Sequence, residues 1–187
     1  MKKIKKFKVN LRKREILRNL KLISEVKEIT PQIEEIVESE IKKSADYVTP
    51  ASVYSSYTHD EMLVKFGPDF LHSEGRKPPG ATFIIVTAGK MIEDEIKTRQ
   101  AGGETIHAAI IRALGLEAVD GALNFVVKLA LNEAKSEDSI LLTPEKIDGK
   151  KAAQALEALE AKKIGVSIDE NGRVQPEFSS VVAVRWK

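Results

Sequence analysis

Hydrophobic residues follow two different periods along this chain, and the change from one to the other predicts where strands give way to helices. The most continuous apolar run covers residues 81–87, and its length and its content of isoleucine and valine predict a fully buried strand at the centre of a sheet. Gly89 ends this run, and the residues from Met91 to Ala101 predict a helix. Apolar residues then recur with the helical period over residues 104–134, which predicts one long buried helix or two helices joined near Gly115.

The N-terminal part predicts a short strand, two helices and a further extended segment. Residues 4–9 place apolar side chains between lysines, which predicts a first strand, and Asn10 is expected to cap the helix that follows. Thr30-Pro31, followed by acidic residues, predicts the start of a second helix that ends near Ala45. Residues 47–62 are rich in β-branched, aromatic and hydroxylated side chains around a proline, so we expect an extended segment or an interrupted edge strand.

The C-terminal part predicts a last helix and a hairpin. Asp148 is expected to cap the helix. Residues 164–168, the Asn171-Gly172 turn and residues 181–186 predict a β-hairpin, because Asn-Gly is a strong two-residue turn signal. Helices and strands follow one another without a βαβ rhythm. We therefore expect an α+β fold, with a mixed or antiparallel twisted sheet and helices packed around it.

The length of 187 residues fits a single domain that spans residues 1–187. In this division residues 1–46 hold the basic strand and the first helices, residues 47–80 are extended or loop, and residues 81–187 form the core of strand, helices and hairpin. The chain has no cysteine, which excludes disulfides, thiolate metal sites and cysteine nucleophiles and fits a cytoplasmic location. No apolar run approaches the roughly 20 residues that cross a bilayer, so we expect no membrane contact.

Charge is distributed unevenly along the chain. Residues 1–21 hold ten Lys or Arg against the single acid Glu15, whereas the remainder holds twenty bases against twenty-seven acids. Such a block can bind nucleic acid, but lysines also protect an exposed first strand and keep a helix solvated. Aromatic residues are only 5% of the chain and do not alternate with the basic block, so stacking platforms for nucleic acid are not indicated. We favour the structural interpretation and expect no nucleic-acid partner.

Motifs of the common enzyme classes are missing. There is no nucleophile elbow, Walker loop or dinucleotide-binding glycine pattern. His59, His72 and His107 lie on separate segments without metal-ligand spacing, so we predict neither a metal site nor catalytic residues. The loop of residues 66–80 collects glycines and prolines beside Arg76-Lys77 and is a candidate mobile, anion-attracting element. One alternative is therefore a small enzyme that acts on an acidic metabolite through this loop.

The second half of the chain resembles the reactivation domain of cobalamin-dependent methionine synthase and its stand-alone relatives. The resemblance covers about half of the chain and is carried by four short stretches: Val86-Thr87-Ala88-Gly89 with Ile92-Glu93; residues 112–120, R-A-L-G-L-E-A-V-D; residues 164–171, I-G-V-S-I-D-E-N; and residues 176–181, P-E-F-S-S-V. Their order and spacing agree with the family pattern of a strand, a Thr-x-Gly turn, an acidic helix, a long helix of small residues and a step into the final strand. The first 80 residues match only loosely.

This resemblance implies a domain that binds S-adenosylmethionine and presents it to a cobalamin held by a partner, with no covalently bound cofactor. The matching positions, and hence the implied cofactor-binding residues, are Thr87, Gly89, Glu93, Glu170 and Ser179. One departure concerns the ligand loop. Where the family has an Arg and a Pro-Gly-Tyr loop before the last helix, this chain has residues 141–148, L-L-T-P-E-K-I-D, and it also lacks the Asp-x-His-x-x-Gly pattern that supplies a corrinoid ligand.

Two hypotheses follow from the resemblance and its departure. In the first, the chain supports a corrinoid-dependent methyltransferase system by reactivating its corrinoid protein or docking with it, and its partner is that corrinoid-binding protein or a methyltransferase subunit. In the second, the scaffold is a non-catalytic protein-interaction module, because the missing loop removes the cation and the close backbone approach that a ligand carboxylate needs.

Overall fold

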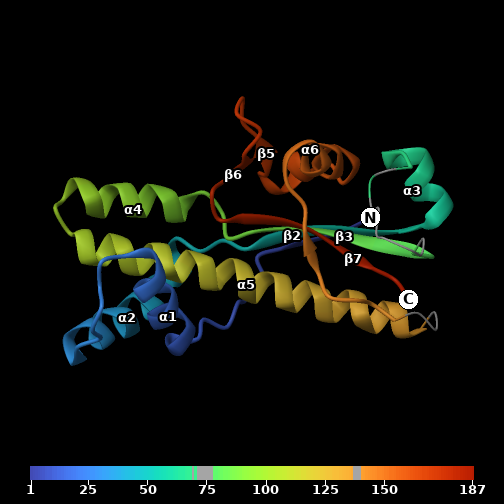
Figure 1. Cartoon of the computed structure of the whole chain (residues 1–187). Coiled ribbons are helices and arrows are strands. Elements are labelled where there is room, and N and C mark those ends of the chain that lie inside the picture. Colours follow the sequence, from blue (N-terminus) through green and yellow to red (C-terminus); the bar gives the residue numbers. More distant parts are fainter. Residues whose placement is uncertain (69, 71–77, 137–139) are drawn as a thin grey trace.

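The computed structural model describes residues 1–68, 70, 78–136 and 140–187. Its centre is an antiparallel sheet with the strand order β1-β2-β3-β7-β4 (Figure 1). The strands are β1 (Lys2–Lys5), β2 (Ala51–Thr58), β3 (Gly80–Thr87), β7 (Ser179–Arg185) and β4 (Glu145–Lys146). Helix α5 runs along one face of the sheet, and α1, α2 and α4 pack against α5. Helices α3 and α6 cover the other face of the sheet. The predicted α+β fold is confirmed.

Strand β3 is the buried centre of the sheet, as its continuous apolar sequence predicts. All eight of its residues are buried. Ile84 and Val86 pack in the core on the α5 face, whereas Phe83 and Ile85 pack in the core under α3 and α6. Because both faces are covered, the strand shows an unbroken apolar run instead of an alternation with polar residues.

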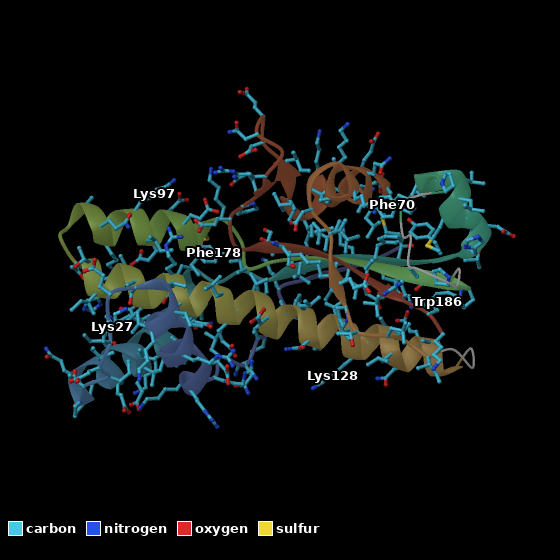
Figure 2. All side chains as sticks on the ribbon, viewed as in Figure 1. Lys27, Phe70, Lys97, Lys128, Phe178 and Trp186 are labelled. Carbon is cyan, nitrogen blue, oxygen red and sulfur yellow. The ribbon has the colours of Figure 1, made fainter. Side chains whose placement is uncertain are left out.

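Helices α4 (Met91–Ala101) and α5 (Thr105–Ser136) follow β3 and form an antiparallel pair (Figure 1). Of the two alternatives for residues 104–134, the single helix holds, since α5 continues through Gly115 for 32 residues. A Cβ atom at Gly115 would lie 2.5 Å from Cδ1 of Phe178. Gly115 therefore makes room for the Phe178 ring, which sits beside α4 and α5 in Figure 2.

The first strand and the first helix differ from their prediction. Strand β1 ends at Lys5, and Phe7 stacks on Phe125 of α5 with ring centroids 4.9 Å apart. Helix α1 (Lys13–Ile23) begins after Arg12, so the predicted Asn10 cap is wrong. The chain before α1 is instead fixed by tertiary contacts, because the Arg12 side chain binds the buried Glu117 carboxylate of α5 at 2.7 Å. Contacts with α5 thus override the local capping preference.

The second helix agrees with its prediction. Helix α2 (Pro31–Lys43) starts with Thr30 Oγ1 accepting the N–H of Ile33 and with proline in the first turn, and a short 3-10 helix, η1 (Ser44–Asp46), ends it.

Residues 47–66 contain a strand and a helix. Strand β2 pairs with β1 on one side and β3 on the other, so the edge-strand alternative is wrong; the lysine-rich β1 takes the edge. Helix α3 (His59–Phe66) was not predicted, although Thr58 and Glu61 form a capping box at its start. Most of the predicted loop of residues 66–80 falls outside the described residues.

The C-terminal hairpin is shorter than predicted. Strand β5 (Ser167–Ile168) pairs with β6 (Val174–Gln175) around the Asn-Gly turn in a separate two-stranded sheet. Residues 181–186 do not form the second arm, because β7 pairs with β3 and β4 in the main sheet. Helix α6 (Gly149–Ala158) begins after Asp148, whose side chain makes no capping hydrogen bond, and the 3-10 helix η2 (Ala161–Ile164) follows. Within the described ranges, no helix combines the length and the hydrophobicity needed to cross a bilayer.

Candidate functional site

Thr87 is the centre of a hydrogen-bonded junction where β3 ends and β7 begins. The Ser179 hydroxyl and the Gly89 N–H both donate to Thr87 Oγ1, at 2.9 and 3.0 Å. The Thr87 hydroxyl in turn donates to the Phe178 carbonyl at 3.3 Å. A hydroxyl offers one donor and two acceptor positions, and these three bonds fill them. Thr87 is also only 1% exposed, so its hydroxyl is committed to the protein.

Gly89 is required by the shape of the turn. Its φ is +94°, a left-handed backbone conformation that residues other than glycine rarely adopt. A Cβ atom at this position would lie 2.1 Å from Oγ1 of Thr49. The neighbouring backbone is held as well, since the Thr49 N–H donates to the Ala88 carbonyl at 2.8 Å. The turn is therefore packed between two segments.

Glu93 joins the first turn of α4 to the segment that precedes β7. Its carboxylate accepts a hydrogen bond from the backbone N–H of Glu177. The Glu177 carboxylate pairs with Arg112 of α5, and the Arg112 guanidinium lies 5.9 Å from the centre of the Phe178 ring. These contacts clamp residues 177–178 against both helices, and they occupy the carboxylate that was predicted to bind a cofactor.

Glu170 does not join this junction. It is exposed in the turn between β5 and β6, which belongs to the separate two-stranded sheet. The neighbouring Asp169 shapes that turn by accepting the N–H groups of Asn171 and Arg173, each at 2.9 Å. The Arg173 N–H, helped by the side chain of Gln175, lowers the pKa of the Asp169 carboxyl. The structure thus brings together Thr87, Gly89, Glu93 and Ser179 and leaves Glu170 apart.

Residues 141–147, which replace the ligand loop of the resembled family, complete the edge of the sheet. Leu141 forms a bridge with Trp186, and the Leu142 N–H donates to the Arg185 carbonyl at 2.8 Å. Strand β4 follows and pairs with β7, and its Glu145 forms an ion pair with Arg185. The backbone of this segment is therefore used for pairing within the sheet.

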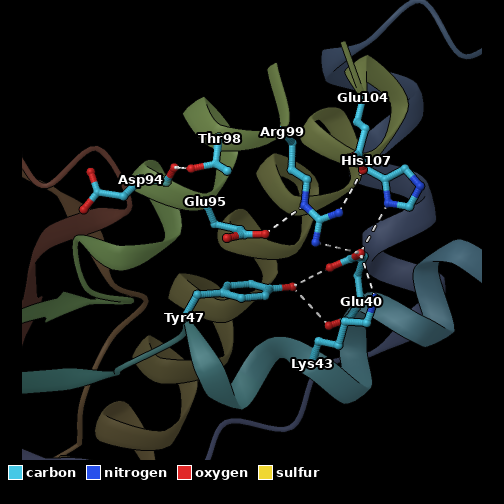
Figure 3. A network of polar contacts seen from close by, with 9 residues as sticks. All are labelled: Glu40, Lys43, Tyr47, Asp94, Glu95, Thr98, Arg99, Glu104 and His107. Atoms are coloured by element: carbon cyan, nitrogen blue, oxygen red, sulfur yellow. Dashed lines mark hydrogen bonds and ion pairs between the residues drawn. The ribbon is translucent and has the colours of Figure 1, made fainter. Parts of the chain in front are cut away.

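A buried carboxylate forms a second polar cluster, between α2, α4 and α5 (Figure 3). Glu40 of α2 is 0% exposed. The Tyr47 hydroxyl lies 3.2 Å from its Oε2 atom, and Nδ1 of His107 lies 3.3 Å from its Oε1 atom. Two cations stand slightly further away, Lys43 at 3.9 Å and Arg99 at 4.0 Å. Such partners are what a buried charge requires, because an unpaired ion in the interior is costly.

Arg99 organises the acidic side of this cluster. Its guanidinium donates to Glu95 and to Glu104 at 2.8 Å each, and these bonds raise the pKa of Arg99 and lower that of Glu104. Burial, reinforced by the Glu40 carboxylate, raises the pKa of Tyr47 far above its ordinary value. Tyr47 is therefore a fixed hydrogen-bond donor at neutral pH. The cluster can hold three helices together electrostatically.

Sequence reasoning missed this cluster because its members are far apart along the chain. The acidic residue at helical spacing from His107 is Glu104, whereas its hydrogen-bond partner Glu40 lies 67 residues away. His59 begins α3, whereas His72, Arg76 and Lys77 lie outside the described residues. Among the residues whose side chains are described, no group of three His, Asp or Glu is arranged to hold a metal ion.

Comparisons with known proteins give a likeness in fold. No family model matches the sequence, and no curated protein resembles it. Among solved structures, the MetH reactivation domain bound to AdoHcy is similar, with a TM-score of 0.61 over 98% of this chain and 77% of that chain. The sequence identity is 11%. This chain therefore has the fold of the MetH reactivation domain.

Proposed function

We propose that this chain supports a corrinoid-dependent methyltransferase system by docking with its corrinoid protein and assisting the reactivation of that protein. The supporting observation is the agreement in fold with the MetH reactivation domain bound to AdoHcy over 98% of this chain. Three of the four stretches that resemble that family in sequence, namely the Thr87 turn, the small-residue part of α5 and residues 176–181, meet at one junction in this fold.

The residues at this junction do not fit S-adenosylmethionine as a ligand. The polar groups of Thr87, Gly89 and Ser179 bond to one another, and Glu93 holds the backbone of Glu177. The segment that replaces the family's Arg and Pro-Gly-Tyr loop is paired with β7. We therefore assign the chain a role in docking with the corrinoid protein and derive no step through S-adenosylmethionine.

A titration followed by NMR tests the proposal. Labelled protein is mixed separately with a cobalamin-loaded corrinoid protein and with S-adenosylmethionine, and we expect resonance changes with the corrinoid protein at concentrations below about 1 mM, the weak end of specific affinity. Glu170→Gln and, as a matched exposed control on α6, Glu157→Gln report whether S-adenosylmethionine uses the predicted residues. Absence of binding to the corrinoid protein would remove the proposal.

The second candidate function is a non-catalytic protein-interaction module, and the exposed apolar side chains of the helical layer favour it. Leu22 and Ile23 at the end of α1 are 76% and 40% exposed, and Ile106 at the start of α5 is 46% exposed. A small cavity of about 200 Å³ lies in the same region between Ile23 and Ala109. In this case we expect a protein partner other than a corrinoid protein and no thermal shift with nucleosides, since a ligand raises the melting temperature only when it binds the folded state.

A further inference from the structure

A cavity of about 390 Å³ lies on the α5 side of the fold, and none of the five predicted cofactor residues lines it, although Gly89 lies against its lining residue Thr49. One wall comes from residues 6–11, which connect β1 to α1, and the other from residues 44–50, which connect α2 to β2. The two walls are joined where the Lys6 N–H donates to the Pro50 carbonyl at 3.0 Å. The volume falls within the range of small-molecule sites.

The lining of this cavity is mainly apolar and is fixed from behind. Phe7, Val9 and Val48 line it and are each only partly buried, so they present apolar surface to the cavity. The Phe7 ring is stacked on Phe125, and Val9 lies against Gly121, where a Cβ atom would come within 2.4 Å of its Cγ1 atom. The wall is therefore formed before any ligand arrives, which lowers the entropic cost of binding.

Two lysines at the cavity carry charge that the described residues do not neutralise. Lys6 and Lys8 are exposed, and within the described ranges neither forms an ion pair. The flanking cations differ, because Lys2 pairs with Glu133, Arg12 with Glu117 and Lys13 with Glu34. Lys6 also has a φ of +56°, which is unusual for a lysine. Among the described residues, Lys3, Lys5, Arg14 and Lys21 of the basic N-terminal block also form no ion pair, but Lys6 and Lys8 are the unpaired cations that line this cavity.

We propose that this cavity binds a medium-chain monocarboxylate, with its apolar tail against Phe7, Val9 and Val48 and its carboxylate at Lys6 and Lys8. The volume of 390 Å³ accommodates roughly a dozen non-hydrogen atoms if each takes about the 30 Å³ of a water molecule, and decanoate has this size. The ligand is a free carboxylate and not a membrane lipid. This activity is independent of the proposed corrinoid role.

An NMR titration with decanoate below its micelle concentration tests this site. We expect saturable shifts confined to residues 6–11 and 44–50, weaker binding at high salt, and no comparable binding of 1-decanol or acetate, which each lack one half of the ligand. Lys6→Asn with Lys8→Gln should weaken binding about tenfold, because two charge contacts are lost while asparagine tolerates the left-handed backbone. Lys3→Gln with Lys5→Gln removes the same charge from β1 and should leave the affinity unchanged.

A substitution that fills the cavity provides a test that does not depend on charge. Ala45 lines the cavity and is exposed, so Ala45→Trp should abolish binding without affecting folding. The proposal is overturned if this variant still binds decanoate, if the β1 variant loses as much affinity as the Lys6 and Lys8 variant, or if 1-decanol binds equally well. Association with anionic phosphatidylglycerol vesicles but not with decanoate would equally overturn it.

Discussion

Replacing Thr87 by valine removes one hydroxyl from the end of β3 and keeps the branched shape of the side chain. Three hydrogen bonds disappear, to Gly89, Ser179 and Phe178. The Phe178 carbonyl keeps the Ala88 N–H as a donor at 2.8 Å, and the Ser179 hydroxyl can rotate toward another acceptor. The Gly89 N–H is the group that loses its partner within a packed turn.

The cost of this change follows from the unpaired donor. The Gly89 N–H is only partly buried, so its lost bond costs about 1 kcal/mol, the lower end of the range for a buried polar group without a partner, and a loss of 1 kcal/mol lowers the melting temperature of a chain of this size by about 2–4 °C. We therefore expect Thr87→Val to melt several degrees below the wild type, as measured by circular dichroism with thermal and urea unfolding. Thr87→Ser keeps the hydroxyl and should lose less.

Thr98→Val is the matched control. It makes the same chemical change on the exposed side of α4, where the hydroxyl bonds only to the Asp94 carbonyl, so little change in melting temperature is expected. If Thr87→Val unfolds at the wild-type temperature, the junction does not depend on its hydroxyl and our structural account of Thr87 is wrong. If Thr87→Val keeps the wild-type stability but loses binding of S-adenosylmethionine, the result would instead favour the cofactor role that the resemblance implies for Thr87.

Three further predictions concern packing, pH and the buried carboxylate. Gly115→Ala should lower the unfolding free energy by about 1 kcal/mol, because the clash with the buried Phe178 ring outweighs the gain in helix propensity; urea unfolding measures it, and a gain in stability would contradict the packing. The pKa of Asp169 is lower in the folded state than in the unfolded state, so its ionised carboxylate stabilises the turn fully above the ordinary aspartate pKa, and this stabilisation is lost as the pH falls through the folded-state pKa. Amide exchange near Asp169 should show this loss, and Asp169→Asn should remove the pH dependence. Arg99→Met should lower the unfolding free energy more in the wild type than in the Glu40→Gln variant, because only the wild type keeps the buried Glu40 carboxylate. Equal losses of unfolding free energy in the two backgrounds of this double-mutant cycle would show that Arg99 and Glu40 are not coupled.

Elements with a strong local signal were predictable from the sequence. The run of residues 81–87 is short, continuous and rich in isoleucine and valine, which favours a buried strand, and Thr30-Pro31 supplies both a cap and a fixed backbone angle for α2. The Asn-Gly turn is also confirmed, but the predicted second arm, residues 181–186, is wrong. A turn signal fixes where the chain reverses and not which strand pairs with it, and β7 pairs with β3, which is about 90 residues away in sequence.

The parts of the site that escaped prediction depend on contacts between distant segments. Nothing near His107 indicates Glu40, because the two residues meet only when α2 packs on α5. The end of β1 is similar, since local sequence favours a longer strand whereas Phe7 gains more by stacking on Phe125. Both cases show tertiary packing overriding a local preference, which a single sequence does not contain.

Three of the four stretches that resemble the reactivation domain also contact one another in this fold, and this explains how short motifs indicate a fold at 11% identity. Gly115 admits the Phe178 ring, the Phe178 carbonyl holds Thr87, and Gly89 fits against Thr49. A change at any one of these positions requires its neighbours to change too, because their contacts are close and mutually dependent. Surface segments carry no such constraint, so a function particular to this chain is best sought where side chains are free of such contacts. The cavity between residues 6–11 and 44–50 is such a place, because its lysines form no ion pair among the described residues.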